Sequence, residues 1–93
     1  MTNEEFASLA ANLLAYPKHT AVEVHLDLEG EFGNVFIVIG QVGGALNAAG
    51  LKDEADAFRS EALRQRSYDD VLRLVLGTVA VRIPDSDGWS YIN

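Results

Sequence analysis

The feature that most constrains the fold is a long apolar run interrupted by glycines, FGNVFIVIGQVGGALNAAG, which ends at Gly50. Its β-branched residues favour a strand. Asn34 near its start, however, is a good helix N-cap, and Gly50 suits the position that follows a helix C-terminus. Because only one adjacent glycine pair interrupts the run between these two signals, we predict a single helix over residues 34–49.

The glycines of this run do not have the spacing of a phosphate-binding loop. They fit neither G-x-G-x-x-G nor G-x-x-x-x-G-K-[ST]. We therefore interpret Gly40, Gly43 and Gly44 as helix-packing positions, where the missing side chain lets another element approach closely. Each glycine costs about 1 kcal/mol relative to alanine in a helix interior, so a close contact should offset it. That contact can lie within the chain, which we favour, or with a second copy.

The other elements are predicted from capping residues and hydrophobic periodicity. Thr2 and Glu5 form a capping box, and AVEVHLDLE alternates as a half-buried antiparallel strand with an acidic outer face. The predicted elements, in chain order, are a helix over 3–15, the strand over 21–29, the helix over 34–49, a helix capped by Asp53 and ending near Arg66, a core helix capped by Ser67 and ended by Gly77, a strand over 78–83 and a short strand over 89–92.

This order, α-β-α-α-α-β-β, predicts an α+β fold. We expect one domain over residues 1–93, with helices packed on one face of a small antiparallel sheet of two or three strands. Such an open sheet has exposed edges. Pairing through those edges predicts a homodimer.

Charge limits the partners that the chain can bind. The 93 residues include 14 acidic and 7 basic ones, and the resulting net charge of −7 falls on residues 1–56. Repulsion from phosphates disfavours direct binding to nucleic acid or an anionic membrane, whereas a basic protein partner is permitted. The chain has no cysteine, its N-terminus MTNEEF lacks a basic signal region, and its longest wholly apolar run is far shorter than a membrane span. We expect a cytoplasmic protein.

Two groups of side chains are candidates for partner binding. The first is an acidic patch formed by Glu23, Asp27, Glu29 and Glu31, whose spacing of about 6–7 Å along a strand resembles that of backbone phosphates. This pattern suggests a nucleic-acid mimic, although a solvated strand face has the same pattern. The second is formed by Trp89 and Tyr91 near the C-terminus, which can anchor a partner or cap the core.

His25 is the one candidate for metal or acid–base chemistry. With Glu23 and Asp27 on the same strand face, it could offer one nitrogen and two carboxylates to a divalent metal. A metal site usually needs a further ligand, and alternating polar residues are ordinary on an exposed strand. We therefore predict no catalytic residue, no metal and no cofactor, and keep a metal-dependent enzyme around His25 as a distant alternative.

Three short motifs stand out along the chain: Glu31 to Asn34 with Phe36, ALNAAG at 45–50 and SYDDVL at 67–72. They resemble those of a family of small uncharacterised bacterial proteins, many of them encoded in phages, plasmids and conjugative elements. The similarity extends from about residue 24 to residue 81 and implies a strand, three helices and a strand. It implies no known activity. Together these observations predict a small non-enzymatic protein-binding or regulatory module, with the nucleic-acid mimic that inhibits a host DNA-binding or defence protein as the alternative.

Overall fold

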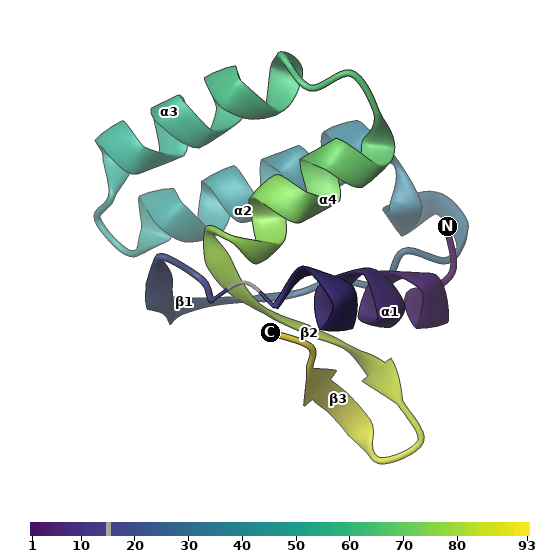
Figure 1. Cartoon of the computed structure of the whole chain (residues 1–93). Coiled ribbons are helices and arrows are strands. Elements are labelled where there is room, and N and C mark those ends of the chain that lie inside the picture. Colours follow the sequence, from purple (N-terminus) through teal and green to yellow (C-terminus); the bar gives the residue numbers. More distant parts are fainter. Residues whose placement is uncertain (15) are drawn as a thin grey trace.

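Four α-helices and three strands make up the computed structural model, which describes residues 1–14 and 16–93 (Figure 1). The predicted α+β class and element order are confirmed. The predicted end of the first helix, residue 15, lies outside the described residues. The elements are α1 (Asn3–Leu13), β1 (His19–His25), the 3₁₀ turn η1 (Gly30–Gly33), α2 (Val35–Ala48), α3 (Lys52–Leu63), α4 (Tyr68–Leu76), β2 (Val79–Asp85) and β3 (Gly88–Tyr91).

The sheet is mixed, with the strand order β1-β2-β3. The β2–β3 hairpin is antiparallel as predicted and pairs Arg82 with Tyr91 and Pro84 with Trp89. The prediction that β1 is antiparallel was wrong, because β1 runs parallel to β2. Alternating burial reports only which face of a strand is covered. The direction of β1 is set by its connection to β2, which passes through α2, α3 and α4.

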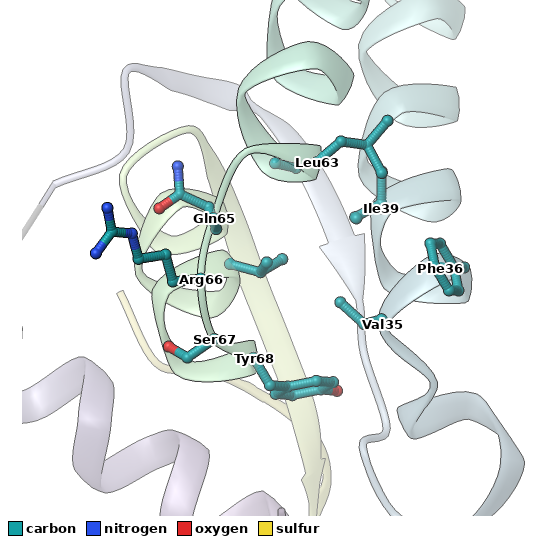
Figure 2. Close-up of a pocket in the computed structure, with 10 residues that line it drawn as sticks. Val35, Phe36, Ile39, Leu63, Gln65, Arg66, Ser67 and Tyr68 are labelled. Carbon is teal, nitrogen blue, oxygen red and sulfur yellow. The ribbon is translucent and has the colours of Figure 1, made fainter.

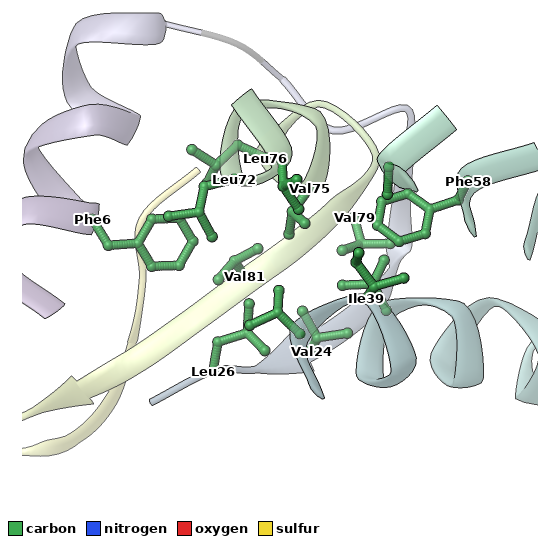
Figure 3. Packing of buried hydrophobic residues seen from close by; sticks show 14 of the residues in the cluster. Phe6, Val24, Leu26, Ile39, Phe58, Leu72, Val75, Leu76, Val79 and Val81 are labelled. Carbon is green, nitrogen blue, oxygen red and sulfur yellow. The ribbon is translucent and has the colours of Figure 1, made fainter. Parts of the chain in front are cut away.

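The hydrophobic core lies between the sheet and the helices, which cover one face of it (Figure 1). Figure 3 shows Phe6 of α1, Leu72 of α4 and Val81 of β2 pointing toward one another, and all three are fully buried. The α4 helix buries one side, whose members are Val71, Leu72, Val75 and Leu76, while Leu74 is half-buried. The predicted core helix therefore turns one side to the core and leaves the other side toward the solvent.

Three of the four predicted helix starts are confirmed. The side chains of Thr2, Asn34 and Ser67 each accept a hydrogen bond from a backbone N–H in the first turn of their helix, and Thr2 completes the capping box with Glu5. The start of α3 was predicted wrongly, since Leu51 precedes the helix without a side-chain cap and Asp53 lies within the first turn. There its carboxylate still faces the positive end of the helix dipole.

The glycines of α2 have different surroundings. A Cβ on Gly43 would lie 2.6–2.9 Å from the guanidinium of Arg59, so α3 packs directly on this residue. Gly40 and Gly44 are exposed, and a Cβ on either would meet nothing within 4 Å. The internal contact predicted for the glycines therefore exists at Gly43 and not at the other two.

Asn93 completes the backbone hydrogen bonds beside the central strand. Its side-chain amide donates to the carbonyls of Leu76 and Val79, each at 2.8 Å, and its carbonyl accepts from the N–H of Val81 at 2.8 Å. The side chain thus joins the end of α4 to β2, where β3 has ended. No sequence pattern indicated this role.

We expect Gly43→Leu to lower the free energy of unfolding by about 2 kcal/mol, because the new side chain overpacks the α2–α3 contact. The control Ala11→Leu adds the same side chain to an exposed position of α1 and should be about as stable as the wild type. Urea unfolding followed by circular dichroism measures both. Equal destabilisation by the two variants would contradict the assignment of Gly43 to internal packing.

Replacing Asn93 by alanine should cost about 2 kcal/mol of unfolding free energy, because the N–H of Val81 loses its acceptor. Asn12→Ala is the control, since Asn12 is exposed on α1. Thermal and urea unfolding of the two variants give the comparison. A stability of Asn93→Ala equal to that of Asn12→Ala would refute the role of this side chain.

Candidate functional site

The candidate site lies on the sheet face that the helices leave uncovered. Alternation along the strands places five side chains there, and the register brings them together, because His25 pairs with Arg82 across β1 and β2 and Arg82 pairs with Tyr91 across β2 and β3. We call this set the open-face cluster. Its members are Glu23, His25, Arg82, Trp89 and Tyr91.

Glu23 lies at the centre of the open-face cluster. The hydroxyl of Tyr91 donates to its Oε1, and the Nε2 of His25 lies 2.8 Å from its Oε2. The Nε of Arg82 lies 3.6 Å from Oε1, near enough for an ion pair. The hydrogen bond from Tyr91, then that from His25 and the charge of Arg82, lower the pKa of Glu23 below its ordinary value of 4.5. Glu23 is therefore an ionised acceptor at neutral pH.

The rings of the open-face cluster are ordered by stacking. The guanidinium carbon of Arg82 lies 4.2 Å from the centroid of the Tyr91 ring, a cation–π contact. The rings of His25 and Trp89 stack with centroids 4.9 Å apart and planes inclined by 25°. Trp89 and Tyr91 are nevertheless 42% and 54% exposed. The cluster thus presents fixed aromatic surface to the solvent.

Arg82 keeps unused hydrogen-bonding capacity. Its Nε is buried and makes no hydrogen bond to any of the residues that the structure describes. Buried donors usually have a partner, and the acceptor placed nearest to this Nε is the Glu23 carboxylate, whose Oε1 lies 3.6 Å away.

Of the four predicted acidic residues, only Glu23 belongs to the open-face cluster. Asp27 accepts from the side-chain amide of Asn3 at 2.9 Å, and Glu29 accepts from the backbone N–H of Asn3 at 3.2 Å. The bond from Asn3 is the main cause of the lowered pKa of Asp27. Both carboxylates therefore hold the start of α1, whereas Glu31 is exposed on η1. The four acids do not form one row, and the nucleic-acid mimic stays a prediction without an observation in its favour.

The predicted metal ligands are separated in the same way. Glu23 and His25 contact one another, but Asp27 turns to Asn3. Across residues 1–14 and 16–93, no three His, Asp or Glu side chains are placed to hold a metal ion. The same part of the chain contains no helix of the length and apolarity that a bilayer span requires.

Sequence reasoning found four members of the open-face cluster for separate reasons and missed Arg82. The alternation in TVAVRI did place Arg82 on the side of its strand opposite Val81 and Ile83. Only the register shows that this side meets His25 and Tyr91.

Comparison of the chain with family models, with curated proteins and with solved structures finds no match. The resemblance to mobile-element proteins therefore stays a prediction. The function has to be inferred from the geometry of the protein itself.

We expect Glu23→Gln to lower the melting temperature near neutral pH, because the ionised carboxylate accepts three favourable contacts. The folded pKa of Glu23 is depressed, so its stabilisation is present above pH 4.5 and is lost as the pH falls through the folded value. The gap between wild type and variant should therefore narrow from about pH 5 to about pH 3, a range below the ordinary pKa of histidine.

Differential scanning calorimetry at both pH values measures this gap. Glu31→Gln is the matched control, since Glu31 is exposed outside the cluster. A gap that stays constant over the range would show that the charge of Glu23 does not stabilise the fold.

Proposed function

We propose that the protein is a non-catalytic module that binds a protein partner through the open-face cluster. The observation that carries this proposal is the exposure of Trp89 and Tyr91 beside the half-buried Arg82 on the sheet face free of helices. Tryptophan, tyrosine and arginine are the residue types most enriched among interface positions that dominate binding energy. Here the three are held in one cluster.

Preorganisation supports binding by these side chains. Tyr91 is bonded to Glu23, Arg82 is stacked on Tyr91, and Trp89 is stacked on His25. Ordering a flexible side chain on binding costs about 0.5–1.5 kcal/mol. Since these side chains are already ordered, less of that cost opposes association.

The same geometry suits binding better than acid–base chemistry. A general base works best with a pKa near the operating pH, whereas the contacts of Glu23 lower its pKa. Its role in the open-face cluster is to orient Tyr91 and His25.

Charge favours a basic partner. The chain carries a net charge of −7, so its long-range field attracts a positively charged protein and raises the association rate. A host protein that handles nucleic acid has this charge, and the resemblance to phage and plasmid proteins is in keeping with such a target. Association should accordingly slow as salt is added.

Substituting Trp89 or Tyr91 by alanine should weaken partner binding by about 30-fold, the loss expected for a dominant interface residue. The partner is isolated on immobilised wild-type protein from host cells and purified, and the affinities of the variants are measured by calorimetry. Tyr16→Ala is the control, because Tyr16 is an exposed tyrosine that does not belong to the open-face cluster. Equal affinities of all variants for that partner would refute the proposal.

A further inference from the structure

A second surface of the protein is apolar and lies on α2 and the adjoining end of α3. Figure 2 shows a groove in which Val35 and Ile39 of α2 lie opposite Leu63 and Tyr68. The groove has a volume of about 240 Å³. The hydroxyl of Tyr68 fixes one end of it by donating to the carbonyl of Gly33 at 2.5 Å.

Large apolar side chains stand exposed in the lining of this groove and on the same turn of α2. Phe36 is 69% exposed, Leu63 is 64% exposed and Ile37 is 39% exposed. The side chain of Leu63 points outward from α3. Contiguous exposed apolar residues of this kind mark an interaction surface in a soluble protein.

The near absence of charge on this surface suits a second copy of this acidic chain. Val35–Ala48 contains no charged residue, and among the residues that the structure describes only Arg66 brings a charge to the lining of the groove. Two copies of a chain with a net charge of −7 repel one another wherever their acidic residues meet. The outer face of α2 is a surface on which they can meet without bringing carboxylates together.

The residue pattern on α2 is self-complementary. Phe36, Gly40 and Gly44 follow one another at steps of four and share the exposed side of the helix. If two α2 helices pack antiparallel with Gly40 on the two-fold axis, equal spacing places Phe36 of each copy opposite Gly44 of the other. The Phe36 ring of one copy then packs on Gly44 of the other, which has no side chain. A Cβ on Gly44 would have no neighbour of its own chain within 4 Å, so there is room for the ring. An isologous interface requires this kind of reciprocity.

We infer that a second copy of this chain docks on the outer face of α2, with the helices antiparallel and Gly40 at the axis. The glycines let the helix backbones approach closely. Leu63 and the groove widen the contact beyond the helix pair, toward the roughly 800 Å² per partner of a stable interface. This dimer differs from one paired through strand edges, and it is independent of the partner proposed for the open-face cluster.

The first test is the mass in solution, measured by sedimentation equilibrium over a concentration series. The wild type should reach twice its 10.1 kDa, and Gly40→Leu should be a folded monomer, with dimer affinity at least tenfold weaker. Ala11→Leu, which adds leucine to an exposed position of α1, should still dimerise. If Gly40→Leu fails to fold, Phe36→Gln takes its place with the same expectation.

The second test uses the absence of cysteine from the chain. Gly40→Cys should form a covalent dimer on mild oxidation, because a disulfide requires Cα atoms closer than about 7 Å, as they are at a two-fold axis between helices in contact. Ala11→Cys should not. Three outcomes would each overturn the inference: a wild type that is monomeric at high concentration, a dimer that Gly40→Leu and Phe36→Gln leave unchanged, or no cross-link at residue 40. A dimer that these two variants leave unchanged would favour pairing through the strand edges.

Two further measurements separate this inference from the proposed function. Gly40→Leu should still bind the partner, and Trp89→Ala should still dimerise.

Discussion

The parallel pairing of β1 with β2 is the interaction on which the rest of the structure depends. It requires a crossover, and the three helices of that crossover supply the core that covers one face of the sheet. The pairing also leaves β2 free on its other side for the hairpin with β3. Side chains from β1 and from the distant β2–β3 hairpin therefore meet on the uncovered face.

A parallel strand with one open face is unusual, because crossover helices commonly cover both faces of such sheets. Here the short chain provides helices for one face only. The uncovered face is then completed by polar and aromatic side chains that satisfy one another around Glu23. The open-face cluster is thus a consequence of topology as well as a candidate for binding.

Local signals explain which parts of the fold could be predicted from the sequence. The caps Thr2, Asn34 and Ser67 act within a few residues, so their helices were placed well. Strand direction and register depend on contacts between distant segments, which periodicity does not report. For the same reason Arg82 was missed as a member of the site. The hydrogen bond from Asn3 to Asp27 was also out of reach, since it joins residues 24 positions apart.

The two surfaces of the protein differ in a way that lets them act together. The open-face cluster lies on the uncovered side of the sheet, whereas the exposed side of α2 is opposite the residues with which this helix packs into the core. Docking two copies through α2 therefore leaves both clusters free and directed away from the interface. A partner with two binding segments could engage both clusters, and the second contact would then form at the high effective concentration set by the first. In the proposed dimer, an affinity that is modest at one cluster would become strong by this means, without any new contact.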